Sequence, residues 1–258
     1  MNLHLKHKTA LVLAASKGLG RAVATTLAHE GAHVVIGSRD KAALEKTAAE
    51  ITEETKNPNI IAVRVDVTKP DELQNIINQT VKTYGGLDIL VNNAGGPPFN
   101  KFETFDDEQW LAAFNQNLLS VVRTSRMVIP HMREAGNGRI INIISASVKS
   151  VMANSVLSTS MRMGVVGMAK LLADEVGPYG ITVNNVAPGL ILTGRIKETL
   201  PPGDIEAALK EKTAGIPVGR IGKPEELAAL VAFLASEQAA YITGATIPID
   251  GGSSRGIY

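Results

Sequence analysis

The stretch Ser16-Lys17-Gly18-Leu19-Gly20 could do chemistry because of both its residue types and its position. It follows the apolar run 11–15, and a continuous apolar run is typical of a strand buried on both faces of a parallel sheet. A turn that opens a helix presents unpaired backbone N–H groups, and the helix dipole adds to their attraction for a phosphate. Gly18 and Gly20 let the backbone bend and approach a ligand closely. The stretch therefore predicts a dinucleotide site, although two such glycines alone are common in turns.

The overall composition excludes several other kinds of site. The 258 residues carry a net charge of +1, which favours neither nucleic acid nor a membrane surface as a partner. There is no cysteine, so disulfides, thiolate zinc sites and a cysteine nucleophile are excluded. No apolar run reaches the length of a membrane span, and the basic residues 6–8 before the first apolar run fit a first strand better than a signal peptide. We expect a cytoplasmic protein without a metal site.

Strand-like and helix-like patterns alternate along the whole chain. Further strands are expected at 33–37, 60–65, 87–91, 139–144, 181–187 and 245–249. Helices are expected at 19–30, 41–55, 71–84, 106–133, 157–176 and 224–235. The long helix 106–133 should bend or end near Pro130, because proline lacks the amide hydrogen that a helix interior needs. This alternation predicts a single α/β domain, a Rossmann-type doubly wound parallel sheet.

Ligands of such sheets bind beyond the carboxyl ends of the strands. The segments expected there are 14–20, 37–39, 66, 92–95, 145–149 and 188–193. Any chemistry should lie among them, and the long irregular segment at about 190–218 is expected to form a lid over a small-molecule substrate.

Four short motifs follow one another in a characteristic order. They are the turn Gly18-Leu19-Gly20, the sequence Asn92-Asn93-Ala94-Gly95, the segment 188–193 and the C-terminal pair 241–244 and 250–252. Together they resemble the short-chain dehydrogenase/reductase family, particularly its 3-oxoacyl-carrier-protein-reductase-like members, over nearly the whole chain. The resemblance implies a Rossmann-fold enzyme that moves hydride between NAD(P) and a carbonyl or alcohol. It also implies a homotetramer or homodimer, with helices 106–133 and 157–176 at the interface.

The resemblance implies a set of cofactor-binding residues. The pyrophosphate would be held by Ser16, Gly18, Leu19 and Gly20, the adenine by Asp66 and Val67, and the adenine ribose by Asn93, Ala94 and Gly95. The nicotinamide end would be held by Pro188, Gly189, Ile191 and Thr193. One departure is Leu13-Ala14, where the family usually has Thr-Gly. We expect Ala14 to take an ordinary backbone angle and the turn to tolerate it.

Charge predicts which dinucleotide would bind. NAD sites place an acid after the second strand, whereas a 2′-phosphate needs a cation. Here that position is Ser38, followed by Arg39, and Lys17 lies in the glycine turn. A guanidinium can bind a phosphate through two hydrogen bonds, so we expect NADP(H) rather than NAD(H). The alternative is that Arg39 and Lys17 are ordinary solvated charges.

The centre of the site departs from the family pattern. The family reduces carbonyls with a Tyr-x-x-x-Lys pair, and the matching positions here are Ser158 and Arg162. Ser145 matches the serine that steadies the substrate oxygen, and Asn117 matches the helix asparagine of the family's proton relay. A serine hydroxyl is a far weaker acid than a phenol, and an arginine cannot release a proton at neutral pH. Cofactor binding is expected to survive, while the usual proton donor is missing.

Lys149, in the loop after Ser145, is a possible replacement. Its ammonium could stabilise a developing alkoxide or donate a proton, and the alternative is an exposed loop residue.

Two functions remain open. One is an NADP(H)-dependent oxidoreductase acting on a 3-oxoacyl-like or other small ketone with an altered proton donor. The other is a catalytically inactive nucleotide-binding sensor or assembly subunit.

Overall fold

Within the residues that the structure describes, seven strands form one parallel sheet in the order β3-β2-β1-β4-β5-β6-β7. The computed structural model describes residues 2–194, 196, 209–210 and 212–256. The strands are β1 (Thr9–Leu13), β2 (His33–Ser38), β3 (Ile60–Arg64), β4 (Ile89–Asn92), β5 (Gly138–Ile143), β6 (Ile181–Pro188) and β7 (Thr246–Ile249). The order steps outward from β1 in both directions, so the carboxyl ends of β1 and β4 flank the point where the winding reverses.

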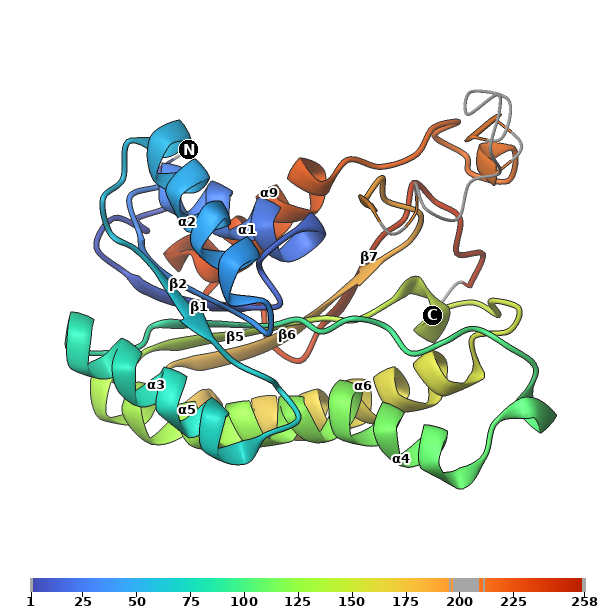
Figure 1. Cartoon of the computed structure of the whole chain (residues 1–258), viewed down its shortest axis with the longest axis horizontal. Coiled ribbons are helices and arrows are strands. Elements are labelled where there is room, and N and C mark those ends of the chain that lie inside the picture. Colours follow the sequence, from blue (N-terminus) through green and yellow to red (C-terminus); the bar gives the residue numbers. More distant parts are fainter. Residues whose placement is uncertain (1, 195, 197–208, 211, 257–258) are drawn as a thin grey trace.

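Helices cover both faces of this sheet (Figure 1). On one face lie α1 (Gly18–His29), α2 (Lys41–Thr55) and α9 (Pro224–Ala235). On the other lie α3 (Pro70–Tyr84), α5 (Ser120–Ala135) and α6 (Val156–Val176), with α4 (Asp107–Phe114) beyond the end of α6. Because both faces are covered, β1, β5 and β6 are buried along their whole length, as continuous apolar strands require. The predicted fold class and single domain are confirmed.

Two large hydrophobic cores form among the described residues, one on each face of the sheet, and two smaller clusters lie beside them. Successive side chains of β1 alternate between them, with Val12 in the core under α1 and α9 and Leu11 and Leu13 in the core over α3, α5 and α6. The chain is thus held from both sides of its central strand.

A row of buried polar side chains crosses the sheet near its carboxyl edge. Asn92 donates to Asn142 over 2.9 Å, Asn142 donates to Asn185 over 2.9 Å, and Asn185 donates to Thr246 over 3.1 Å. These residues are register partners on β4, β5, β6 and β7. Thr124 of α5 completes the row with a 2.6 Å hydrogen bond to Asn92. Buried amides need such partners, so the row fixes the register of four neighbouring strands.

The expectation of one long helix at 106–133 is wrong in one respect. It is divided by a π-helical turn, η2 (Asn115–Leu119), and α5 then continues through Pro130 to Ala135. Pro130 lies on the exposed side of α5, where water can replace the missing amide donor. The division instead places the side chains of Gln116 and Asn117 on the carbonyl of Gly95, at 2.6 and 2.9 Å. Such π turns are frequent at functional sites.

One helix is more apolar than the sequence analysis allowed. The segment Val156–Tyr179 is long and apolar enough, by length and composition, to cross a membrane. One side of it, with Leu157, Val165 and Ala169, is buried inside the fold, while Met163 and Leu171 on its other side are exposed. Much of the expected lid falls outside the described residues, namely 195, 197–208 and 211. The chain just before and just after this segment is hydrogen-bonded together. The backbone N–H of Leu192 donates to the carbonyl of Gly222 over 2.8 Å, and the N–H of Gly222 donates to the carbonyl of Leu190 over 3.0 Å.

The backbone of Ala14 contradicts the expectation of an ordinary angle. Its φ is +50°, in the left-handed region that favours glycine. A Cβ there costs about 1–2 kcal/mol. The strain arises because the chain must turn sharply from β1 toward α1 at this residue.

Ala14→Gly is therefore expected to raise the free energy of unfolding by about 0.5–1 kcal/mol, since relief of the strain exceeds the entropy that glycine adds to the unfolded chain. Urea denaturation followed by circular dichroism measures it. The matched control is Ala49→Gly on the exposed side of α2, expected to lower the free energy of unfolding by about 1 kcal/mol. A loss of stability in both variants would contradict strain at Ala14.

Candidate functional site

The carboxyl edge of the sheet gathers the segments that the sequence analysis selected. The glycine turn follows β1, Asn93–Gly95 follow β4, Ser145–Lys149 follow β5, and Gly189–Thr193 follow β6. Ser38 and Arg39 lie at the end of β2, and Asp66 lies just beyond β3. These segments come from distant parts of the sequence and meet because parallel strands end on the same side.

The glycine turn is shaped for close approach. A Cβ on Gly20 would lie 2.5 Å from the carbonyl oxygen of Ala14, a contact that real Cβ atoms do not make. Gly18 has a φ of +60° and opens α1, with Lys17 exposed before it. A Cβ on Gly18 would lie 3.6 Å from Cγ2 of Thr193. The segment after β6 therefore lies beside the glycine turn.

Hydrogen bonds from neighbouring elements hold the glycine turn in place. Asn93 donates to the carbonyl of Ala14 over 3.4 Å, and Thr47 of α2 donates to the carbonyl of Ser16 over 2.9 Å. The backbone N–H of Gly189 donates to the carbonyl oxygen of Ile249 over 3.0 Å. A Cβ atom on Gly189 would lie only 2.6 Å from the Cβ atom of Asp250. The C-terminal Asp-Gly-Gly motif thus packs directly on the segment after β6.

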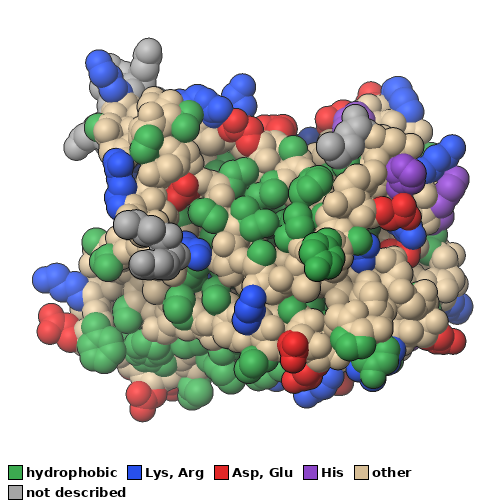
Figure 2. All heavy atoms as spheres, turned by 180° about the vertical axis from the view of Figure 1, so that it is seen from behind, with side chains coloured by type: hydrophobic (Ala, Val, Ile, Leu, Met, Phe, Trp, Pro, Cys, Tyr) green, Lys and Arg blue, Asp and Glu red, His purple; other side chains and the backbone are tan. Residues whose placement is uncertain are grey.

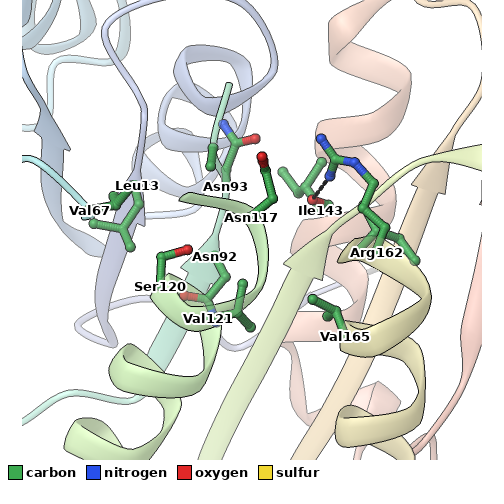
Figure 3. Close-up of a pocket in the computed structure, with 12 residues that line it drawn as sticks. Leu13, Val67, Asn92, Asn93, Asn117, Ser120, Val121, Ile143, Arg162 and Val165 are labelled. Carbon is green, nitrogen blue, oxygen red and sulfur yellow. Dashed lines mark hydrogen bonds between the residues drawn. The ribbon is translucent and has the colours of Figure 1, made fainter. Parts of the chain in front are cut away.

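A small hollow lies at the centre of the edge (Figure 3). It has a volume of about 10 Å³, room for about one water molecule. Asn117 borders it from η2 and Arg162 from α6, and Val67, Asn93 and Ala94 also line it. Asn117 Oδ1 is buried and has no hydrogen-bond partner among the described residues, so this acceptor can receive a hydrogen bond from a bound group. Two of the residues predicted to be catalytic, Asn117 and Arg162, are thereby brought together.

Ser158 and Arg162 form a buried pair one turn apart on α6. Arg162 Nε donates to Ser158 Oγ over 3.0 Å, and Arg162 Nη1 donates to the carbonyl of Ile143 over 3.2 Å. Both side chains are more than nine-tenths buried. Because Ser158 Oγ accepts from the guanidinium, its own hydroxyl hydrogen can be donated to another oxygen. The pair places a fixed positive charge and a hydroxyl side by side.

Ser145 and Lys149 lie in the loop after β5. Ser145 Oγ accepts the amide of Ser147 over 3.2 Å, which holds its side chain at the start of the short helix η3 (Ala146–Val148). Lys149 ends that helix, with its amide donating to Ala146 over 2.9 Å, and its side chain is half-buried. Lys149 lines a different hollow from the one that Asn117 and Arg162 share.

The corner at β2 and β3 carries opposite charges. Ser38 is buried and donates to the carbonyl of Asp40 over 3.4 Å, while Arg39 is exposed. Burial raises the pKa of Asp66, but hydrogen bonds from Thr68 and the charges of Arg39 and Lys69 outweigh it and hold that pKa below its usual value. Asp66 is therefore ionised near a cation at the place predicted for adenosine.

Three tyrosines of the described part of the chain lie away from this edge. Tyr84 stacks on His33, Tyr179 lies beneath the guanidinium of Arg133, and Tyr241 is fully exposed. Tyr258 lies outside the described residues. Gln116 was missed by the sequence analysis, although it adjoins Asn117 and binds the same carbonyl of Gly95. The backbone carbonyl of Ile143, an acceptor for Arg162, left no pattern in the sequence.

The chain is similar to known proteins over nearly its whole length. A protein-family model described as Enoyl-(Acyl carrier protein) reductase matches residues 13–254. A 3-oxoacyl-[acyl-carrier-protein] reductase FabG of Vibrio cholerae is 38% identical over 252 residues, covering 97% of this chain and 98% of the relative.

Two solved structures have nearly the same backbone. The L-sorbose reductase of Gluconobacter frateurii, complexed with NADPH and L-sorbose, has a TM-score of 0.94 at 30% identity with full coverage of both chains. YwfH, an NADPH-dependent reductase involved in bacilysin biosynthesis, has a TM-score of 0.91 at 32% identity, covering 97% of this chain and 99% of that one.

The Ser158–Arg162 pair generates a stability prediction. Ser158→Ala leaves the buried Arg162 Nε–H without its acceptor, so the free energy of unfolding is expected to fall by about 1–3 kcal/mol. Ser160→Ala, on the exposed side of the same helix, is the matched control and is expected to change it by less than about 0.5 kcal/mol. Thermal and urea unfolding measure the stability of both variants. Equal stabilities would contradict a stabilising hydrogen bond between Arg162 and Ser158.

Proposed function

Since this chain belongs to the short-chain dehydrogenase/reductase family, we propose that it is an NADP(H)-dependent oxidoreductase that transfers hydride between nicotinamide and a carbonyl or alcohol. The proposal rests on the site that the carboxyl edge assembles, where Ser145, Asn117 and Arg162 lie around the same strand ends as the glycine turn. The FabG relative is named a 3-oxoacyl reductase, and the two structural neighbours are named NADPH-linked reductases. A 3-oxoacyl-like or other small ketone is the substrate we propose.

The residues of the edge fit a dinucleotide. Gly20 lets the start of α1 pack directly on the backbone of Ala14 and Ala15, and α1 opens there with unpaired backbone amides suited to a pyrophosphate. We assign Ser16, Leu19 and Gly18 to the pyrophosphate, and Asp66, Val67 and Asn93–Gly95 to the adenosine. Pro188, Gly189, Ile191 and Thr193 would hold the nicotinamide end. The cations Lys17 and Arg39, with Ser38, would receive the 2′-phosphate.

The chain's own residues must then handle the proton. NADPH supplies a hydride when it is bound, and reduction of a carbonyl to an alcohol also needs one proton at the carbonyl oxygen. Ser145 would hold that oxygen by a hydrogen bond, and Ser158, whose Oγ already accepts from Arg162, can donate its hydrogen toward it. Arg162 stays charged and would bind the ribose next to Asn117. Because neither hydroxyl is a strong acid, the proton must come ultimately from solvent or from Lys149.

A second function has one observation in its favour. Ser158 and Arg162 occupy the positions that the resemblance assigns to the family's Tyr and Lys, so the phenolic acid is absent. An inactive nucleotide-binding sensor or assembly subunit would need the dinucleotide site without the proton donor. Retention of Ser145 and Asn117, which a sensor would not need, supports the enzyme.

Assembly and location are part of the same proposal. Large apolar side chains are exposed on two helices that lie on the same side of the sheet (Figure 1), Leu111 and Phe114 on α4 and Met163 and Leu171 on α6. Burying them between copies would be favourable, which supports a homodimer or homotetramer. We also propose that the enzyme is cytoplasmic.

The proposed 2′-phosphate site leads to a prediction about cofactor choice. Lys17→Ala and Arg39→Ala are each expected to weaken NADPH binding about tenfold, the equivalent of about 1.4 kcal/mol, because a charge-assisted contact to the 2′-phosphate is lost. NADH binding should be unchanged. Titration of nicotinamide fluorescence measures both affinities, and Lys41→Ala is the control, since Lys41 already pairs with Glu45 on the surface. Equal affinities of the unaltered protein for NADH and NADPH would contradict a 2′-phosphate site.

The proposed enzyme activity leads to a prediction about turnover. A panel of 3-oxoacyl thioesters, quinones and aldehydes at high enzyme concentration should reveal at least one substrate that oxidises NADPH. With it, Ser145→Ala is expected to lower kcat by about 100-fold or more, because a hydrogen bond to the developing oxyanion is lost.

Lys149→Ala tests the replacement proton donor with the same substrate. It should lower kcat more than Lys82→Ala, an exposed lysine of α3 far from the edge. Unchanged kcat in Lys149→Ala would exclude this residue from the proton transfer. Unchanged kcat in Ser145→Ala would contradict the assigned oxyanion contact.

A further inference from the structure

The C-terminal tail, residues 250–255 after β7, has no part in the function proposed above, although it carries the motif Asp250-Gly251-Gly252. The tail lies against two other segments. One is the loop 189–193 after β6, which carries residues that we assign to the nicotinamide end. The other is the segment 215–222.

These three segments form a closed ring of backbone hydrogen bonds. The loop is tied to the end of β7, because the N–H of Gly189 donates to the carbonyl of Ile249 over 3.0 Å. The segment 215–222 is tied to the tail, because the N–H of Val218 donates to the carbonyl of Gly251 over 3.1 Å. The loop and the segment 215–222 are joined by the two hydrogen bonds of Gly222 described above. Each segment is thus held by both of the others.

The ring is also closely packed. Gly251 has a φ of +64°, and a Cβ atom there would lie 2.7 Å from Cγ2 of Ile216, which is buried. On the other side of the tail, the backbone of Gly189 packs directly on Asp250. Close contacts on both sides leave the tail little freedom to rearrange while the ring stays closed.

The carboxylate of Asp250 folds the tail into this shape. Its Oδ1 accepts the N–H of Gly252 over 2.9 Å, and its Oδ2 accepts the N–H of Ser254 over 2.8 Å and the hydroxyl of Ser253 over 3.2 Å. Burial raises the pKa of Asp250, but the hydrogen bonds from residues 252–254 outweigh it and hold that pKa below its usual value. Both oxygens of an ionised carboxylate therefore face donors of the tail.

We propose that Asp250 is a positioning residue for the nicotinamide end of the dinucleotide. It fixes the tail, the tail closes the ring, and the ring holds the loop 189–193. Ile191 and Thr193 are thereby kept where the cofactor would meet them, with Thr193 beside the glycine turn. The inference rests on the proposed function in taking this loop as the one that binds nicotinamide, and Asp250 itself acts without touching the cofactor.

Two ligands test this role, NADPH and adenosine 2′,5′-bisphosphate, which lacks the nicotinamide half. Asp250→Ala is expected to weaken NADPH binding about five- to tenfold, as when about a fifth to a tenth of the molecules keep the loop in its binding arrangement. Binding of the bisphosphate should be unchanged, because it does not reach the loop. A general loss of stability would not separate the two ligands. Fluorescence titration measures NADPH, and isothermal titration calorimetry measures the bisphosphate.

Two further variants serve as a graded test and a control. Asp250→Asn keeps the shape of the side chain but turns an NH2 group toward an N–H donor, so it should weaken NADPH binding less than Asp250→Ala does. Asp106→Ala also removes a carboxylate that accepts a backbone N–H, that of Gln109 over 2.8 Å at the start of α4. It should leave both affinities unchanged.

Hydrogen–deuterium exchange followed by NMR tests the ring without any ligand. The amides of Gly189 and Val218 bond to backbone carbonyls and not to Asp250. In Asp250→Ala they should nevertheless exchange about tenfold faster, because the ring opens more often. The amide of Ile144, bonded to Val186 over 2.8 Å inside the sheet, should be unaffected.

The outcomes separate this inference from the proposed function. Equal weakening of both ligands in Asp250→Ala, unchanged NADPH affinity, or unchanged exchange at Gly189 would each overturn the positioning role. An unaltered chain that binds neither ligand would contradict the proposed function and, with it, the role toward nicotinamide. Selective loss of NADPH affinity together with faster exchange would support both.

Association between copies of the chain is another way in which the tail could be held. Hydrophobic side chains gather in the middle of one face of the molecule, and most charged side chains lie toward its rim (Figure 2), so copies can pack there. Sedimentation velocity on the unaltered chain and on both Asp250 variants measures the oligomeric state. An unchanged state supports the proposal, whereas an oligomer that dissociates in Asp250→Ala as NADPH affinity falls would overturn it.

Discussion

The hydrogen-bonded row Asn92–Asn142–Asn185–Thr246 is the interaction on which the site depends. A parallel sheet fixes which strands are neighbours, but a slip by one residue would turn every side chain to the opposite face. The row makes such a slip costly, because each buried amide would lose its partner. The residues directly after these strands, from Asn93 to Gly189, therefore meet at one edge with defined spacing. Thr124 extends the same constraint to α5 and so to the π-helical turn that carries Asn117.

In the mechanism we propose, Ser158 and Arg162, which stand where the family resemblance places Tyr and Lys, would change one function of the site and preserve another. The guanidinium still supplies a permanent positive charge beside Asn117, and its bonds to Ser158 Oγ and the Ile143 carbonyl fix its position. Under the proposed function, the site would lack an acid strong enough to protonate an alkoxide by itself. Binding and proton supply, which one Tyr–Lys pair combines, would then be separated, and we propose that the nearby Lys149 links the two.

The fold could be predicted closely from the sequence, because apolar runs and helical spacing leave little choice for a doubly wound sheet. Three local features could not. The left-handed angle of Ala14 depends on the path between β1 and α1, and alanine gives no indication of it. Pro130 suggested a break, but exposure decides whether a helix tolerates proline, and the real break lies where side chains reach Gly95. For the site, strand ends and motifs indicated the residues, whereas the grouping of Asn117 with Arg162 needs coordinates.

The most direct test of the central claim is to follow hydride itself. NADPH deuterated at the transferred C4 position is incubated with the protein and a mixture of ketones and aldehydes, and mass spectrometry searches for deuterium on the carbinol carbon of the products. The account predicts a deuterated alcohol with the unaltered chain and a strongly reduced yield with Ser145→Ala. Tight NADPH binding without deuterium in any product would contradict an oxidoreductase and favour the nucleotide-binding sensor.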